Sequence, residues 1–246
     1  MAIPQLVAHR GYTLHYPENT LLGIEAAIRA GARYVEVDIQ LSADQVPILL
    51  HDKTLQRVCG IDGAAHNYTL AQLQQFKAME FDRFGYRYAS ARLSTLTELT
   101  ALLAKYPDVT AFIELKRISL ERFGAITVLN RIRRELETIR SRCVIISFDL
   151  DALIAARHHW PKIGVVVDYW RERRQHKVKS LRPEYLFCDV DGLPRWGRLT
   201  FQESQVVIYE VADPALALSL ADRGVNLIET FAIGEMHRAL ELASAA

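Results

Sequence analysis

Two apolar runs near the start of the chain are ended or interrupted by polar side chains that can carry acid–base or metal chemistry. His9 and Arg10 follow the first run, and Glu36 and Asp38 alternate with apolar residues in the second. Because successive side chains of a strand point to opposite faces, Glu36 and Asp38 share one face if this run is a strand. Taken alone, each motif is more typical of a solvent-exposed strand face or a surface hydrogen bond.

A third motif repeats the alternation, since Glu114 and Lys116 also share one face of an apolar run. Three carboxylates at one site would repel one another and lose hydration, so they would need a cation or a proton. The chain has no cysteine or histidine pair at metal-ligand spacing. An all-oxygen ligand set favours a hard divalent ion, Mg²⁺ or Ca²⁺, over zinc.

A second imidazole comes from His51, at the end of the apolar run 47–50. Two histidines at one site can divide proton transfer: one takes a proton from a nucleophile, and the other protonates a leaving oxygen. If Arg10 and a metal ion neutralise a phosphate between them, this combination suits phosphodiester chemistry.

The elements that must position these residues alternate along the chain. Apolar and β-branched runs predict eight strands, over residues 5–8, 33–40, 110–115, 143–146, 163–167, 185–188, 205–209 and 226–228. Helical spacing predicts helices over residues 20–30, 95–105, 120–140, 149–158, 215–223 and 234–244. This is the pattern of an α/β fold, the (β/α)8 TIM barrel, whose catalytic residues lie at the C-terminal ends of the strands. A doubly wound sheet is disfavoured because no glycine-rich turn follows the first strand.

The domain organisation follows from the length and from one irregular stretch. The chain has 246 residues, a size typical of one α/β barrel, so we expect a single domain over residues 1–246. About forty residues separate His51 from Leu93, where a short crossover would suffice. We interpret residues 52–92 as an insertion after the second strand, on the face that carries the loops, with an extra strand at 47–50 and a short helix at 70–77.

The composition excludes several classes of partner. Lys and Arg total 30 against 29 Asp and Glu, and this balance argues against nucleic acid as a partner. A basic run at 170–179 is interpreted as a solvated helix face, with an anion-binding patch as the alternative. Three scattered cysteines, no signal peptide and no long apolar run predict a cytoplasmic protein without stable membrane insertion.

The polar motifs, in this order and spacing, resemble the glycerophosphodiester phosphodiesterase family. The matching segments are His9-Arg10-Gly11, Pro17-Glu18-Asn19-Thr20, Glu36-Val37-Asp38, His51-Asp52, Ile113-Glu114-Leu115-Lys116 and Ser147-Phe148-Asp149. The resemblance implies a divalent metal site, an acid–base pair and a phosphate site. The metal site would consist of Glu36, Asp38 and Glu114. The acid–base pair would be His9 and His51, and the phosphate site would consist of Arg10 and Lys116. It also implies a small-molecule glycerophosphodiester as substrate, cleaved to glycerol 3-phosphate and an alcohol.

The C-terminal third departs from the family pattern, at 209–212 and 229–232, where this chain carries Glu210 and Glu229. An added acid facing the site would favour a cationic head group such as choline. A lysophospholipase D, another phosphodiesterase on a related head group, and a barrel that binds phosphodiesters without turning them over stay open as alternatives. The oligomeric state is not predicted.

Overall fold

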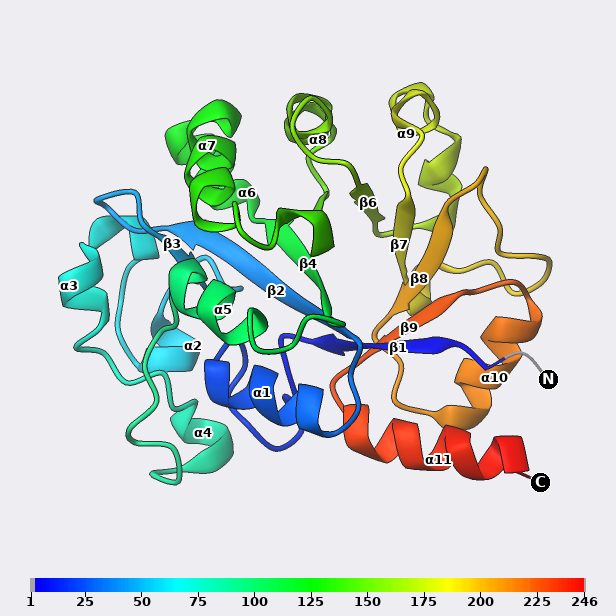
Figure 1. Ribbon diagram of the computed structural model, residues 1–246, viewed down its shortest axis with the longest axis horizontal. Coiled ribbons are helices and arrows are strands. Elements are labelled where there is room, and N and C mark those ends of the chain that lie inside the picture. Colours follow the sequence, from blue (N-terminus) through cyan, green and yellow to red (C-terminus); the bar gives the residue numbers. More distant parts are fainter. Residues whose placement is uncertain (1–2, 246) are drawn as a thin grey trace.

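The computed structural model describes residues 3–245. Within this range, eight parallel strands close into a barrel, because β1 pairs with both β2 and β9 (Figure 1). The strands are β1 (Gln5–His9), β2 (Tyr34–Leu41), β4 (Thr110–Leu115), β5 (Cys143–Ser147), β6 (Ile163–Val167), β7 (Tyr185–Asp189), β8 (Gln205–Tyr209) and β9 (Leu227–Thr230). Each lies within two residues of its predicted range. The predicted (β/α)8 barrel is therefore confirmed.

Helices surround the barrel and connect successive strands. They are α1 (Leu21–Arg29), α5 (Leu96–Leu103), α6 (Arg117–Phe123), α7 (Ala125–Glu135), α8 (Leu150–Arg157), α9 (His176–Leu181), α10 (Pro214–Asp222) and α11 (Ile233–Ala245). Side-chain caps fix several helix starts: the Thr20 hydroxyl accepts from the Gly23 N–H, and Asp149 accepts from Ala152. No described helix combines the length and the apolar character that crossing a membrane requires.

The prediction of a single helix over 120–140 is wrong. The structure divides it into α6 and α7, followed by a 3-10 turn at Arg140–Arg142. Gly124 separates the two helices with a φ of 79°, a left-handed conformation that ends a helix at little cost for glycine. The basic run 170–179 covers a 3-10 turn (Trp170–Arg174) and most of α9, two short elements that sequence periodicity did not separate.

Two apolar cores hold the barrel. A large core fills the space between the strands and the outer helices, and a smaller one fills the barrel interior. The inner core includes Val7, Phe112, Phe187 and Leu227, each buried. Alternation along each strand continues this inward row toward the C-terminal end of the barrel, where polar residues replace the apolar ones.

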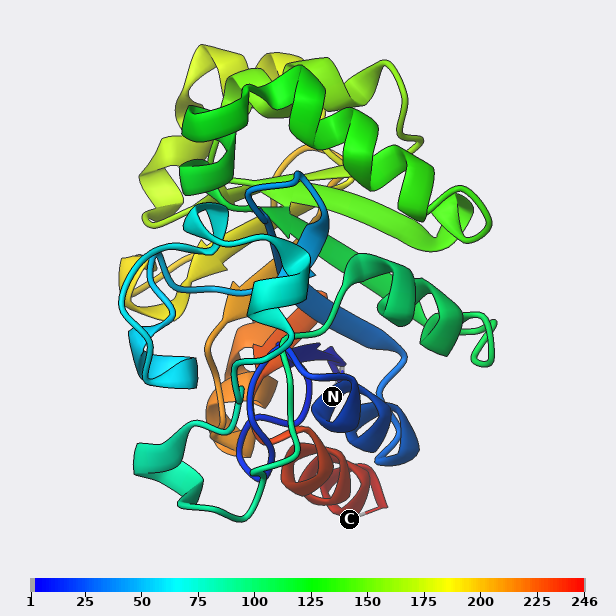
Figure 2. The same cartoon turned by 90° about the vertical axis from the view of Figure 1, so that its left-hand side faces the viewer.

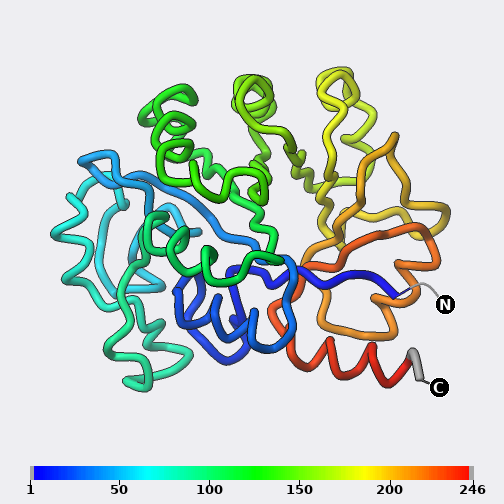
Figure 3. Tube along the Cα trace, viewed as in Figure 1, coloured from blue at the N-terminus to red at the C-terminus, as the bar shows by residue number. Residues whose placement is uncertain are grey.

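Residues 52–92 lie at the barrel end where the strands finish, as Figures 2 and 3 show. Strand β3 (Pro47–Leu49) pairs antiparallel with the end of β2 and leads into this segment. It contains α2 (Gln56–Cys59), a 3-10 turn (Ala65–Asn67), α3 (Leu70–Leu73) and α4 (Phe81–Phe84). The helix expected over 70–77 is shorter in the structure, where it is α3. Residues 52–92 also have their own buried apolar cluster, centred on Leu55, Val58 and Leu73.

Candidate active site

Strand register brings the predicted acidic residues to one end of the barrel. His9 of β1 stands beside Glu36 of β2, and Asp38 of β2 stands beside Glu114 of β4. Glu36 is 1% exposed and Asp38 is fully buried. These side chains therefore meet above the inner core, at the C-terminal ends of the strands.

Two cations and one amide donor lie close to the Asp38 carboxylate. Lys116 Nζ lies 3.1 Å from Asp38 Oδ1, Arg10 Nε lies 3.1 Å from Oδ2, and the Asn19 amide donates to Oδ2 at 2.9 Å. Burial opposes ionisation of Asp38, but Lys116 and Arg10 outweigh it and hold the pKa of this carboxyl well below its usual range. Asp38 is therefore an anion that organises both cations.

Glu36 and Glu114 have the opposite electrostatic environment. Burial and the charge of Asp38 raise the pKa of both carboxyls above the usual value, and Lys116 only partly compensates Glu114 at 2.8 Å. Oxygen atoms of Glu36, Asp38 and Glu114 lie within 4.8 Å of one another. Glu36 Oε1 is buried and has no hydrogen-bond partner among the described residues. A buried carboxylate oxygen without a partner, in an all-oxygen set, fits a hard divalent cation.

His9 lies between two carboxylates. Its Nδ1 is 3.0 Å from Glu210 Oε1, and its Nε2 is 3.8 Å from Glu36 Oε2. Burial and the neighbouring Arg10 lower the pKa of His9 below its ordinary value, and the hydrogen bond to Glu210 partly opposes this. The contact with Glu210 favours the tautomer with the proton on Nδ1, which leaves the Nε2 lone pair free to accept a proton.

His51 is anchored from the other side of the site. Its Nδ1 lies 2.9 Å from Asp52 Oδ1, and Arg57 binds the second oxygen of Asp52 at 2.7 Å. The buried Gln40 amide donates to the backbone carbonyls of Leu50, His51 and Asp52. These contacts fix the loop that carries the second imidazole.

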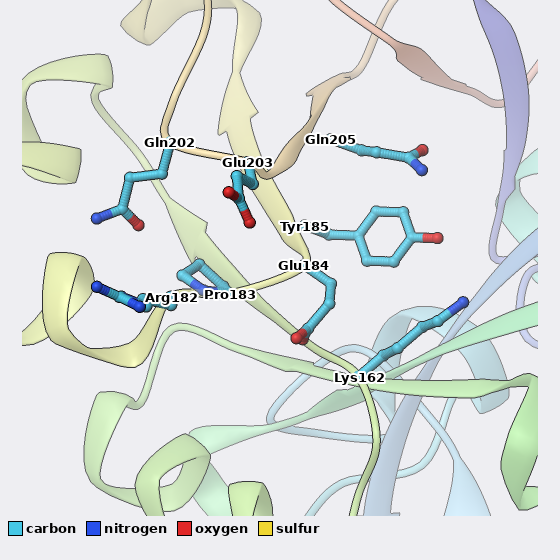
Figure 4. A pocket seen from close by; sticks show the side chains of 8 residues that line it. All are labelled: Lys162, Arg182, Pro183, Glu184, Tyr185, Gln202, Glu203 and Gln205. Atoms are coloured by element: carbon cyan, nitrogen blue, oxygen red, sulfur yellow. The ribbon is translucent and has the colours of Figure 1, made fainter.

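A narrow cavity of about 90 Å³ joins the two histidines with Arg10, Lys116, Glu36 and Glu114. The site residues predicted from the sequence thus surround one space, with Asp38 directly behind its cations. A separate cavity of about 520 Å³ is lined by Tyr185 and Gln205, the first residues of β7 and β8 (Figure 4). That cavity lies at the opposite end of the barrel and contains none of the predicted site residues.

Comparison with known proteins agrees with this geometry. The model of the glycerophosphoryl diester phosphodiesterase family matches residues 9–228. The chain belongs to this family. Residues 9–228 include every segment that carried the resemblance, so the family expected from the motifs is confirmed.

Relatives within the phosphodiesterase family have low sequence identity to this chain, but the matched regions cover most of it. Glycerophosphodiester phosphodiesterase 1 of Bos taurus is 27% identical over 192 residues, which are 77% of this chain and 53% of the bovine protein. The glycerophosphodiester phosphodiesterase of Caldanaerobacter subterraneus is 29% identical over 187 residues, covering 73% of this chain and 75% of that protein. The chain therefore spans about half of the bovine relative and three quarters of the bacterial one.

Solved structures share the whole fold. A phosphodiesterase from Oleispira antarctica, in complex with the product sn-glycerol-3-phosphate, is 25% identical and superposes with a TM-score of 0.84, covering 97% of each chain. The glycerophosphodiester phosphodiesterase of Thermotoga maritima has a TM-score of 0.74 at 22% identity, over 97% of this chain and 99% of that one, and shows the fold alone.

Two acids that depart from the family pattern also lie in the site, and from the sequence they were expected only to favour a cationic head group. Glu229 is 3% exposed and lines the narrow cavity, and its Oε1 has no hydrogen-bond partner among the described residues. Burial and the charge of Glu114 raise its pKa well above the usual value. Glu210 follows β8 and binds His9. Alternation with the inward Leu227 would have placed Glu229 in the barrel interior.

Proposed function

We propose that this protein hydrolyses glycerophosphodiesters to glycerol 3-phosphate and an alcohol, by metal-dependent, two-histidine catalysis. One observation carries the proposal: two carboxylate-bound histidines share a narrow cavity with two cations and a buried carboxylate cluster. The product bound to the Oleispira antarctica phosphodiesterase is the same one proposed here.

The proposed metal ligands are Glu36, Asp38 and Glu114, and the candidate ions are Mg²⁺ and Ca²⁺. When bound, such an ion would act as a Lewis acid on the phosphate oxygens and relieve repulsion among the acids. Arg10 and Lys116 bring positive charge to the same cavity and are oriented by Asp38. We assign the phosphate to these two cations.

The proposed reaction has two displacement steps. The glycerol 2-hydroxyl attacks phosphorus, a histidine accepts its proton, and the bond from phosphorus to the alcohol oxygen breaks. The other histidine gives that oxygen a proton, so the alcohol leaves neutral. Water then attacks the cyclic phosphate and opens it to glycerol 3-phosphate. The lowered pKa of His9 suits the base, because this imidazole is neutral near pH 7.

The test is release of glycerol 3-phosphate from a panel of glycerophosphodiesters, with and without chelator. We expect turnover with Mg²⁺ or Ca²⁺, loss of turnover with EDTA, and a fall in kcat of about 10²–10⁴-fold in His9→Ala and in His51→Ala. The matched control is His176→Ala, an exposed histidine on α9 outside the cavity, which should retain wild-type turnover. Full activity in either cavity variant, or in EDTA, would contradict the mechanism.

Lysophospholipids join the panel as acylated substrates. Release of free head group from them, with no glycerol 3-phosphate from any glycerophosphodiester, would assign the protein to lysophospholipase D chemistry instead.

A further inference from the structure

An open groove continues outward from the narrow cavity. It has a volume of about 560 Å³. One wall is the loop 51–54 after β3, and the other is the segment 115–118 at the end of β4 and the start of α6. Phe148 and Asp168, which follow β5 and β6, also line it. A volume of this size accommodates an organic group much larger than a single phosphate.

The groove and the narrow cavity meet at the reacting groups. His51, Glu114, Lys116 and Phe148 line both spaces, whereas His9 lines only the inner one. A phosphate placed at Lys116 therefore has one ester oxygen toward the inner cavity and the other toward the groove. Because the inner cavity is small, the bulkier substituent of a phosphodiester belongs in the groove.

The charged side chains of the groove walls are mainly cationic once existing pairs are counted. Asp52 is already bound to His51 and Arg57. Glu114 also lines the groove and is bound to Lys116. Lys53 and Arg117 stand on opposite walls and form no ion pair with a carboxylate among the described residues, and Asp168 is the acid of the groove lining that has no such pair. Glu210 and Glu229 line the inner cavity and are not part of the groove.

The aromatic side chain of the groove is already in contact with a cation. The Arg117 guanidinium lies 5.3 Å from the centroid of the Phe148 ring. A quaternary ammonium such as choline binds best over an open aromatic face. Here it would have to displace Arg117 or bind beside a like charge. Hydroxyl and phosphate oxygens, in contrast, can accept hydrogen bonds from both cations.

We propose that this groove binds the leaving alcohol of the substrate and selects polyhydroxylated or anionic head groups, such as inositol or glycerol, over quaternary ammonium ones. The inference rests on the proposed function and specifies its substrate class. It reverses the expectation that acids near the site would favour choline, because those acids lie inside the barrel mouth, away from the groove.

The experiment compares kcat/KM for glycerophosphoinositol, glycerophosphoglycerol and glycerophosphocholine in the metal-loaded protein. We expect the two polyol substrates to be preferred over the choline substrate by about 10-fold. Lys53→Ala and Arg117→Ala should lower kcat/KM for the polyol substrates, mainly through KM, and leave the choline substrate unchanged or improved. The matched control is Arg122→Ala, an arginine of α6 that contacts Phe123 and does not line the groove.

The possible outcomes separate this inference from the proposed function. A choline preference, equal use of all three substrates, or polyol selectivity that survives both groove variants would overturn the groove assignment and leave the phosphodiesterase activity standing. Absence of glycerol 3-phosphate from every diester would reject the proposed function, and the groove assignment with it. If Arg117→Ala unfolds the chain, Arg117→Gln, which also removes the charge, and Lys53→Ala test the same wall charges.

Discussion

At the scale of single residues, the contact between Glu210 and His9 has a measurable consequence. Glu210→Gln keeps the size of the side chain but removes its charge, so the Nδ1–H tautomer of His9 loses much of its stabilisation. We expect kcat to fall about 10-fold to 100-fold with little change in KM, comparable to losing the orienting partner of a functional histidine. ¹⁵N NMR of the imidazole should show a mixed tautomer population. An unchanged tautomer together with unchanged kcat would contradict this role.

The same contact also affects the pH dependence of the activity. A base must be neutral, and its neutral fraction falls as pH falls through its pKa. Because burial and Arg10 lower the pKa of His9, the acidic limb of kcat/KM should lie below pH 6.5. Glu210 raises that pKa, so Glu210→Gln should move the limb to still lower pH. Glu203→Gln, at the far cavity, serves as the control.

Residue-level prediction succeeded where alternation continued through a strand. Glu36, Asp38 and Glu114 were predicted to lie at the barrel mouth, because polar residues that alternate with apolar ones along a strand can be recognised from the sequence. Glu229 was recognised only as a departure from the family pattern near the mouth and was assigned no catalytic or metal role, and the predicted strand stopped one residue before it, at 228. Glu210 lies beyond the end of β8, where no periodicity applies, and its contact with His9 depends on barrel closure.

At the scale of elements, Gln40 connects strand β2 to the loop that carries His51. Its amide donates to three consecutive carbonyls, and it is fully buried. Gln40→Leu should leave these carbonyls short of donors and destabilise the fold by about 1–3 kcal/mol, measured by urea unfolding. We also expect a lower kcat, since His51 is no longer held. Gln56→Leu on α2, where the glutamine is exposed, is the control. Equal stability of both variants would show that the bonds to the loop contribute nothing.

Element boundaries were predictable where a local residue sets them. The capping side chains of Thr20 and Asp149 mark the starts of α1 and α8. The break at Gly124 was missed because the apolar spacing continues on both sides, and the cost of a positive φ is visible only in the backbone. The short helices of residues 52–92 were mostly missed, since four-residue helices have too little periodicity to detect.

At the scale of the whole molecule, the buried acids link stability to pH and to metal. Burial raises the pKa of Glu36 and Glu229, so the folded, metal-free protein holds protons that the unfolded chain has lost above the ordinary carboxyl pKa. The free energy of unfolding should therefore fall as pH rises from about 5 to about 8. Asp38 contributes with the opposite sign, but its lowered pKa places that contribution in the acid range, outside this window. The lowered pKa of His9 also opposes the fall, up to about pH 6.5, so the fall in stability should be clearest above that pH.

A divalent cation that binds only the folded barrel should reverse this loss. At a concentration of about 100 times Kd it contributes about 2.7 kcal/mol, which raises Tm by about 5–10 °C for a protein of this length. We expect Mg²⁺ or Ca²⁺ to raise Tm more at about pH 8 than at about pH 5, and EDTA to cancel the gain, as calorimetry would record. Glu229→Gln, which removes one unpaired buried acid, should flatten the pH dependence of the metal-free protein, whereas Glu203→Gln at the far cavity should not. A Tm that is insensitive to both metal and pH would show that the carboxylate cluster holds no cation.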